Sequence, residues 1–165
     1  IDGDGITSLV HAGDDVKAGR DIVLTPHMGE YARLAERFDL PMAAETDAQR
    51  RSAAEQLTQC TGCTIVLKGR GTVVSSPGQR TWTCEEGSNI LAVPGSGDVL
   101  AGLIGGLLAA QARQGDCDVG AMTRLAVRAH ALAGEAWAAS VARRGMLARE
   151  LADRIPGVLD GLEQA

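Results

Sequence analysis

The scarcity of aromatic side chains is the feature that most constrains how this chain can fold. One Phe, one Tyr and two Trp stand among 165 residues, although 45% of the residues are hydrophobic. The core must therefore be filled by Ala, Leu, Val and Ile, and such small side chains require the packed elements to approach closely. The composition favours helices packed on a sheet, and the length favours one domain.

Charge and hydropathy argue against several classes of partner. The formal net charge of −5 leaves no basic face in bulk for nucleic acid or an anionic membrane. The longest weakly polar stretch, residues 99–110, is shorter than a bilayer requires. The four cysteines form no disulfide framework, and the Cys60–Cys63 motif has no second pair at zinc-binding spacing. We therefore expect a cytoplasmic protein that binds neither nucleic acid nor membrane and has no metal centre built from cysteines.

The first residues carry no sign of a targeting segment. Ile1-Asp2-Gly3-Asp4 has neither the basic region nor the apolar run of a signal peptide. The isolated Ile1 is typical of the end of a strand whose beginning is missing, so a fragment is expected. Asp2 and Asp4 fit either a ligand-binding or metal-binding position or a simple turn.

The first half of the chain reads as strands alternating with helices. Strands are expected over 21–24 and 63–68, and a hairpin over 72–75 and 81–84 closes around Pro77-Gly78. A helix is expected up to residue 38, with Thr25 as its N-cap and Pro26 in its first position. A capping box, Thr46 to Gln49, predicts a second helix that ends near residue 59.

The second half begins with a short apolar segment over 90–93, expected as a strand, and is otherwise expected to be helical. Helices are expected from Asp98 onward, over 121–143 and over 147–162, the last one interrupted at Pro156-Gly157. Three glycines inside the first of these helices, Gly102, Gly105 and Gly106, predict a close approach to a neighbouring backbone. The whole order favours a largely parallel α/β sheet that binds ligands beyond the carboxyl ends of its strands.

The segment Gly95-Ser96-Gly97-Asp98 is the strongest candidate for chemistry. A glycine-rich turn that leads into a helix offers free N–H groups and the positive end of the helix dipole to an anion. Asp98 could accept a proton from a substrate hydroxyl. The alternative is an ordinary acidic residue that stabilises the helix N-terminus.

Two further segments have both a functional and a structural interpretation. Lys68-Gly69-Arg70-Gly71-Thr72 is not a Walker A loop, but it could cradle a phosphate or ribose, or form a tight solvated turn. Thr25 to Glu30 places His27 and Glu30 on the first turn of a helix, where capping is the simpler explanation. His11 and His130 are expected to be structural.

Five segments taken together resemble one family. In order they are Asp2–Ile6, Thr25–Glu30 (T-P-H-x-G-E), Val66–Thr72 (V-L-K-G-x-x-T), Asn89–Gly102 (containing G-(T/S)-G-D-V-L-x-G) and Ala126–Glu135. Their order and spacing resemble the ADP-dependent NAD(P)H-hydrate dehydratases, which have a ribokinase-like fold. Met28 replaces a Pro that is common in the family motif, and Val93-Pro94 replaces small residues. Both departures leave the candidate catalytic and binding residues of the motifs in place.

The resemblance implies a three-layer α/β fold with a mostly parallel sheet flanked by helices. Residues 1–165 would be the C-terminal part of a single domain, without its N-terminal strands. The reaction it implies restores (S)-NAD(P)H-hydrate to NAD(P)H while ADP becomes AMP and phosphate. A phosphoryl transfer to the ring hydroxyl would be followed by elimination of phosphate.

The resemblance also assigns roles to individual residues. Asp98 would be the catalytic base and would contact the hydrate, and His27 would lie against the hydrate. The anion hole would be Gly95, Ser96 and Gly97, and the nucleotide site would comprise Lys68, Gly69, Arg70, Gly71, Thr72 and Gly97. ADP would be the phosphoryl donor, and Mg²⁺ would neutralise phosphate charge with few direct protein ligands.

Two alternatives share the same motifs. A ribokinase-like small-molecule kinase would use the same anion hole and base but would stop at the phosphorylated product. A partial domain could bind nucleotide without turnover. We also expect a homo-oligomer, because the Gly-rich helix from Asp98 and the Ala-rich helix from Ala121 could pack between subunits.

Overall fold

A computed structural model describes residues 1–11, 21–42 and 44–163. The first half holds α1 (Asp4–His11), β1 (Val23–Leu24), α2 (Met28–Arg37), α3 (Asp47–Thr61), β2 (Thr64–Leu67), β3 (Val73–Ser75) and β4 (Trp82–Thr83). The second half holds a short 3₁₀ helix η1 (Asn89–Leu91), α4 (Ser96–Ala112), α5 (Val119–Ser140) and α6 (Ala148–Glu163). The predicted alternation of strands and helices is confirmed in the first half, except that no prediction anticipated α1. The strand expected over 90–93 is wrong, because η1 occupies this place.

The sheet has the order β1-β2-β3-β4 and is mixed rather than mostly parallel. Strands β1 and β2 pair in parallel, with Val23 opposite Thr64, whereas the β2–β3 and β3–β4 pairs are antiparallel. The reason is the length of the connections. Two helices, α2 and α3, separate β1 from β2 and allow a parallel crossover, but the short loops after β2 and β3 can only form hairpins.

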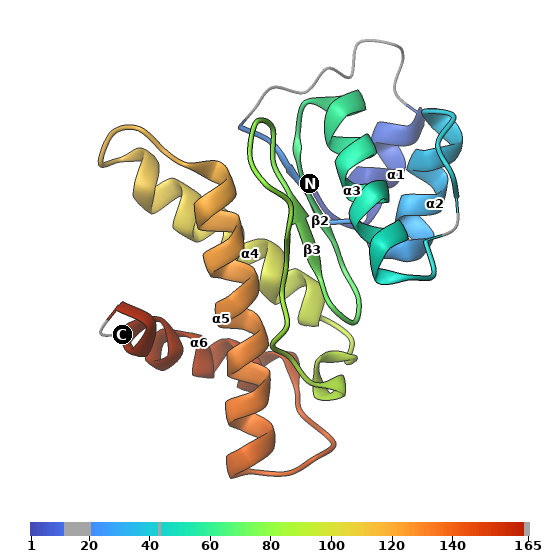
Figure 1. The fold of residues 1–165 in the computed structure, drawn as a ribbon. Helices are drawn as coiled ribbons and strands as arrows, with labels where there is room; N and C mark the ends of the chain where they lie inside the picture. Colours follow the sequence, from blue (N-terminus) through green and yellow to red (C-terminus); the bar gives the residue numbers. More distant parts are fainter. Residues whose placement is uncertain (12–20, 43, 164–165) are drawn as a thin grey trace.

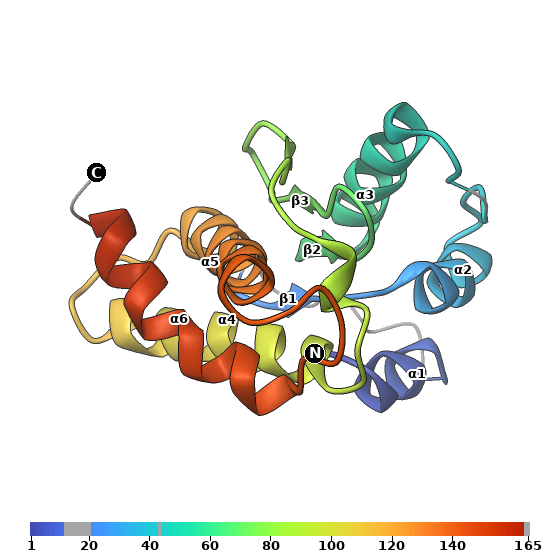
Figure 2. The ribbon, with the colours of Figure 1, turned by 90° about the horizontal axis from the view of Figure 1, so that it is seen from below.

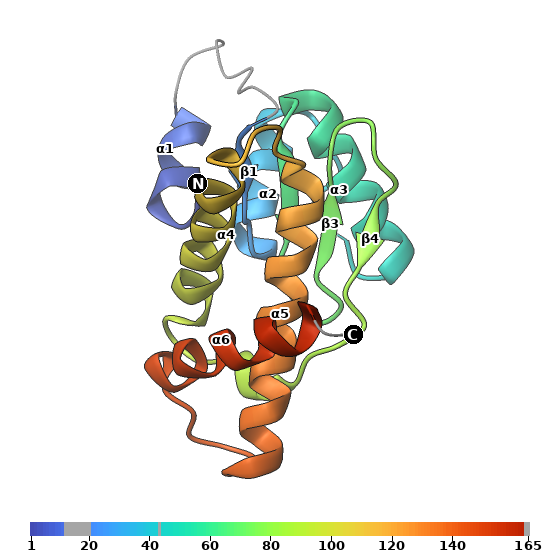
Figure 3. The same cartoon turned by 90° about the vertical axis from the view of Figure 1, so that its left-hand side faces the viewer.

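Helices cover both faces of the sheet and make three layers. Figures 1 and 2 show α1, α2 and α3 on one side and α4 and α5 on the other. Side chains alternate between the faces, as they must in strands: Leu24, Ile65 and Leu67 pack in the first core, and Val23, Val66 and Val74 pack in the second. A third core joins α5 to α6, which lies across it in Figure 3. The cores consist almost entirely of aliphatic side chains, as the composition predicts.

Several local predictions about the helices are wrong in detail. The helix predicted to begin at Asp98 begins at Ser96, and α6 runs through Pro156 without the predicted interruption. The predicted close backbone approach at three glycines of α4 is also wrong. No atom of the described residues lies within 4 Å of the position that a Cβ would take on Gly102, Gly105 or Gly106. No helix in the described ranges is both long and apolar enough to cross a membrane.

Strand β1 has a neighbour on each side. Its partner on one side is β2. On the other side, the amino group of Ile1 donates to the Val23 carbonyl over 2.7 Å, and the Thr25 N–H donates to the Ile1 carbonyl over 3.1 Å. These bonds follow the pattern of a parallel ladder. Ile1 therefore holds Asp2 beside the carboxyl end of β1.

Candidate active site

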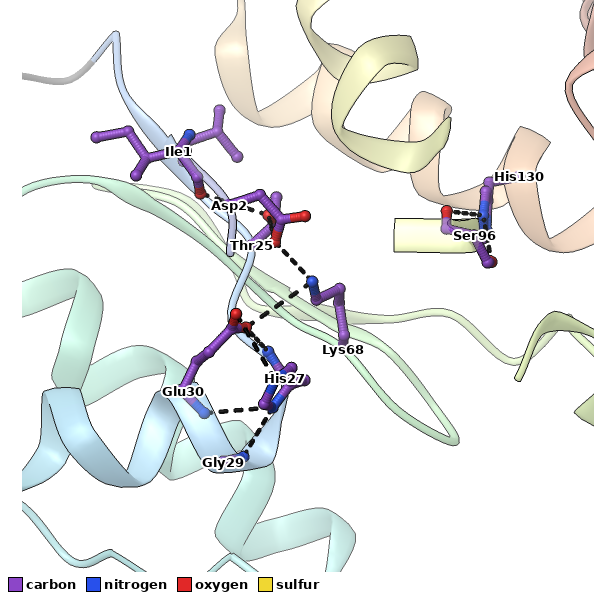
Figure 4. Close-up of polar contacts among 10 residues, drawn as sticks. Ile1, Asp2, Thr25, His27, Gly29, Glu30, Lys68, Ser96 and His130 are labelled. Atoms are coloured by element: carbon purple, nitrogen blue, oxygen red, sulfur yellow. Dashed lines mark hydrogen bonds and ion pairs between the residues drawn. The ribbon is translucent and has the colours of Figure 1, made fainter. Parts of the chain in front are cut away.

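Residues from distant parts of the sequence meet where β1 and β2 end. Thr25 and His27 follow β1, Lys68 follows β2, and the Lys68 N–H donates to the Pro26 carbonyl over 2.8 Å. Figure 4 shows Lys68 between Asp2 and Glu30. The carboxyl ends of parallel strands are the usual binding edge of an α/β sheet. The site therefore lies at the edge that the sequence predicts.

A network of charged groups is centred on the Lys68 ammonium. Its Nζ lies 2.6 Å from Asp2 Oδ1 and 3.9 Å from Glu30 Oε2, and these three side chains are largely buried. The Thr25 hydroxyl donates to the same Asp2 oxygen over 2.7 Å. Burial by itself raises the pKa of Asp2, but the hydrogen bonds from Lys68 and Thr25 outweigh it and hold that pKa below its ordinary value. The network keeps Lys68 in a defined place.

The N-terminus of α2 is closed by its own side chains. Nδ1 of His27 accepts from the N–H groups of Gly29 (3.0 Å) and Glu30 (3.2 Å), and Glu30 Oε2 accepts from the His27 N–H over 2.7 Å. His27 is therefore the N-cap, and the prediction that Thr25 caps this helix is wrong because the Thr25 hydroxyl is bonded to Asp2. Since Nδ1 accepts, neutral His27 carries its proton on Nε2. Its side chain is 58% exposed, so it can still meet a ligand.

The N-terminus of α4 is open. Gly95 is the N-cap, with φ 83° and no side chain to accept a hydrogen bond from the first turn. A Cβ on Gly97 would lie 3.4 Å from Lys68 Nζ and 3.7 Å from Asp2 Oδ2, so the first turn of α4 faces the charge network. Asp98 is exposed on this turn. The arrangement suits an anion, because uncapped N–H groups and a fixed ammonium face the same space.

The loop that follows β2 packs against Arg50 of α3. Arg50 is buried and its Nη2 donates to the Leu67 carbonyl over 3.1 Å. A Cβ on Gly69 would lie within 2.9 Å of the Arg50 guanidinium, and Gly69 and Gly71 both have positive φ angles. The Thr72 hydroxyl donates to the Gly69 carbonyl over 3.0 Å, and Arg70 is exposed. Of the predicted nucleotide-binding residues, Lys68 and Gly97 thus lie together, while Gly69 to Thr72 form the adjoining loop.

Two residues beside this site are not predicted to belong to it. Asp2 fits either a ligand or a turn, and no local spacing joins it to Lys68. His130 of α5 is expected to be structural, yet its Nε2 lies 3.0 Å from the Ser96 carbonyl oxygen and 3.2 Å from the Ser96 hydroxyl. The only sequence signal that links this helix to the site is the family segment Ala126–Glu135, which contains His130.

A separate groove of about 1080 Å³ lies beside β4 and shares no residue with this site. Three of its arginines are already engaged: Arg128 bonds Glu86 (2.8 Å), Arg124 bonds Gln79 (2.6 Å) and Arg51 bonds the Thr81 carbonyl (2.8 Å). Because these charges have partners, the groove is a weaker candidate for an anion than the start of α4.

Comparison with known proteins identifies the family of this chain. The family model for NAD(P)H-hydrate dehydratase matches residues 1–157. A bifunctional NAD(P)H-hydrate repair enzyme of Thermanaerovibrio acidaminovorans is 41% identical over 98% of this chain and 30% of its own length. An ADP-dependent (S)-NAD(P)H-hydrate dehydratase of Xanthomonas campestris is 35% identical over 87% of this chain and 47% of its own length.

Solved structures give the same result. An ADP/ATP-dependent NAD(P)H-hydrate dehydratase of Bacillus subtilis, co-crystallised with ATP and Mg²⁺, matches 84% of this chain and 47% of its own with a TM-score of 0.71 at 32% identity. A ribokinase-like superfamily protein of Enterococcus faecalis matches 98% of this chain and 51% of its own with a TM-score of 0.78 at 28% identity. The chain thus spans about half of these solved chains and less than half of the two curated relatives. With the expected ribokinase-like α/β fold confirmed, the chain belongs to the NAD(P)H-hydrate dehydratase family.

Proposed function

We propose that this chain supplies the phosphoryl-transfer part of an ADP-dependent (S)-NAD(P)H-hydrate dehydratase. The observation that carries the proposal is the open first turn of α4, which faces Lys68 and bears Asp98. A phosphoryl group needs an anion hole, and the hydroxyl that attacks it needs a base. Both lie within one turn of one helix.

The proposed reaction has two steps. Asp98 accepts the proton of the ring hydroxyl while the hydroxyl oxygen attacks the β-phosphorus of ADP. The bond between that phosphorus and the oxygen of AMP breaks, and AMP leaves. The phosphorylated ring then loses phosphate together with a ring proton, and the nicotinamide double bond is restored. The Gly95–Gly97 turn holds the phosphoryl oxygens during the transfer through the Gly97 N–H, because the Ser96 N–H already donates to the Val93 carbonyl over 3.2 Å. His27, whose side chain is largely exposed, lies against the hydrate.

The remaining residues hold the nucleotide. Lys68 places a positive charge beside the anion hole, and Gly69, Arg70, Gly71 and Thr72 form the loop over which the nucleotide lies. Mg²⁺ would neutralise phosphate charge when bound. Asp2 and Asp98 carry the oxygen ligands that suit it, and the described residues form no cluster of three or more ligand side chains. Mg²⁺ would therefore be bound mainly through phosphate and water.

We propose a homo-oligomer in the cytoplasm as the setting of this reaction. The support is the exposed, small-residue face of α4, on which Gly102, Gly105 and Gly106 leave open space in the single chain. Light scattering of the purified chain measures the oligomeric state. A strictly monomeric chain contradicts this part of the proposal.

The test of the function supplies NADH-hydrate with ADP and Mg²⁺ and follows NADH absorbance together with AMP and phosphate. Recovery of NADH with equal amounts of AMP and phosphate supports the proposal. A stable phosphorylated product without NADH identifies the kinase alternative. Saturable ADP binding with no product identifies a nucleotide-binding partial domain, and the absence of both binding and product contradicts all three.

A further inference from the structure

His130 connects α5 to the first residue of α4. Its Nε2 lies 3.0 Å from the Ser96 carbonyl oxygen and 3.2 Å from the Ser96 hydroxyl, and Figure 4 shows both contacts. Ser96 is 5% exposed and His130 is 8% exposed. This buried contact therefore lies directly behind the Gly95–Gly97 turn.

The contact fixes the protonation state of the imidazole. A carbonyl oxygen only accepts, so Nε2 must carry the proton that it donates to Ser96. Burial lowers the pKa of His130, and the hydrogen bond to the Ser96 backbone opposes this effect only in part. At neutral pH the ring is therefore neutral, with its proton on Nε2.

The same contact fixes the first peptide group of α4. The peptide bond between Ser96 and Gly97 is trans, so the Gly97 N–H points opposite to the Ser96 carbonyl. While His130 donates to this carbonyl, the Gly97 N–H points away from the helix at its uncapped N-terminus. A donor on the carbonyl also polarises the peptide group and makes its N–H a stronger donor.

We propose that His130 is a positioning residue of the anion hole. Its neutral Nε2–H holds the Ser96–Gly97 peptide so that the Gly97 N–H is presented to a phosphoryl oxygen. This inference rests on the proposed function, because it assumes that the turn binds a phosphate. A purely structural histidine would instead stabilise the packing of α4 on α5 and leave the geometry of the turn unchanged.

Two variants separate these roles. His130→Gln keeps a side-chain N–H that can reach the carbonyl, whereas His130→Leu keeps similar bulk and removes the donor. Thr123→Val is the matched control: Thr123 also lies buried on α5, and no residue in the described part of the chain makes a hydrogen bond to its hydroxyl. All three exchange a buried side chain of the same helix, and two of them alter the contact with Ser96.

The first measurement is the nitrogen NMR spectrum of the ligand-free wild-type chain. We expect the His130 ring signals of the Nε2–H tautomer and a Gly97 amide signal that moves in His130→Leu but stays near its wild-type position in His130→Gln and Thr123→Val. An Nδ1–H tautomer, or a Gly97 signal that is unchanged in His130→Leu, overturns the inference. The tautomer is read from the wild type, so it decides even where a variant does not fold.

The second measurement titrates each chain with ADP and follows the Gly97 amide. We expect ADP affinity to fall about tenfold in His130→Leu, as for the loss of one hydrogen bond, and to stay within about threefold of wild type in His130→Gln. Equal affinities in the two variants contradict the positioning role. If ADP does not bind the wild type at Gly97, the proposed function fails. The ligand-free spectra still test the contact between His130 and Ser96 in that case, because they do not depend on ADP.

Discussion

Two helices that begin at the binding edge of the sheet, α2 and α4, differ in whether side chains accept hydrogen bonds from their first N–H groups. The first turn of α2 is closed, because His27 accepts from two of its N–H groups and Glu30 accepts from the N–H of His27. The N-cap of α4 is Gly95, which has no side chain, so no side-chain hydrogen bond caps its first turn. A helix that satisfies its own donors has little to offer a ligand. The difference identifies α4, not α2, as the place for an anion.

Lys68 lies between the N-termini of α2 and α4. Its ammonium contacts Glu30 of the α2 cap and Asp2, and it lies beside the Gly97 position of α4. The closed terminus thus helps to hold the cation that faces the open one. The role of α2 in this account is to stabilise the site, and the role of α4 is to bind. The first three of the following changes each alter one terminus and leave the other in place, and the fourth alters the ion pair of Lys68 between them.

Asp98→Asn has the largest expected effect. General-base catalysis contributes about 10²- to 10⁴-fold, so kcat for NADH-hydrate dehydration should fall by that factor while ADP binding persists. Asp47→Asn is the control, because Asp47 is the exposed acidic residue in the first turn of α3, away from the anion hole. If both variants keep wild-type kcat, Asp98 is not the base.

Gly97→Ala closes the open terminus. The added methyl would lie against Lys68 Nζ and in the path of the anion, so ADP affinity should fall about tenfold, as for one lost hydrogen bond. Gly157→Ala in α6 meets open space and should instead raise the free energy of unfolding by about 0.5–1 kcal/mol without changing ADP affinity. Calorimetric titration and denaturant unfolding measure the two quantities. Unchanged ADP affinity in Gly97→Ala would place the phosphate elsewhere.

His27→Ala opens the closed terminus. Loss of the cap should lower the free energy of unfolding by about 1 kcal/mol, and His27→Asp should restore most of it because Asp also caps helices. The pair separates two roles of His27: if it also contacts the hydrate, His27→Asp recovers stability but keeps a raised KM for NADH-hydrate. Full recovery of KM in His27→Asp rules out a specific imidazole contact.

Asp2→Asn has the smallest expected effect and depends on pH. The pKa of Asp2 is lower in the folded chain than in the unfolded chain, so its ion pair with Lys68 stabilises the fold above the unfolded pKa of about 3.9. This contribution is lost as the pH falls through the folded pKa. We expect Asp2→Asn to destabilise the chain by less than about 1 kcal/mol at neutral pH and by less at pH 3. A difference that grows toward low pH contradicts the account.

The sequence predicted those features that depend on neighbouring residues. The capping box of Thr46 and Gln49, the hairpin around Pro77-Gly78 and the turn of Gly95 were all predicted correctly, because a short stretch of chain specifies each of them. The N-cap of α2 was misassigned for a local reason. Thr25 and His27 are both able to cap, and only the hydrogen bond from Thr25 to Asp2 removes Thr25 from this role.

The rest depends on contacts between residues far apart in the chain. Lys68 meets Asp2 across 66 residues, and His130 meets Ser96 across 34. Helical or strand periodicity carries no information on such pairs, because the fold decides which ends of which elements meet. The same holds for Gly102, Gly105 and Gly106, since their spacing resembles a packing surface whether or not a neighbour is present.

The most direct test of the central claim compares the two helix N-termini in one titration. ADP is added to the wild-type chain while the backbone amide signals of Gly97 and Asp98 in α4 and of Gly29 and Glu30 in α2 are followed by NMR. The account predicts saturable shifts of the α4 amides and unchanged α2 amides, which remain bonded to His27. Shifts confined to the α2 amides, or equal shifts at both termini, would contradict it.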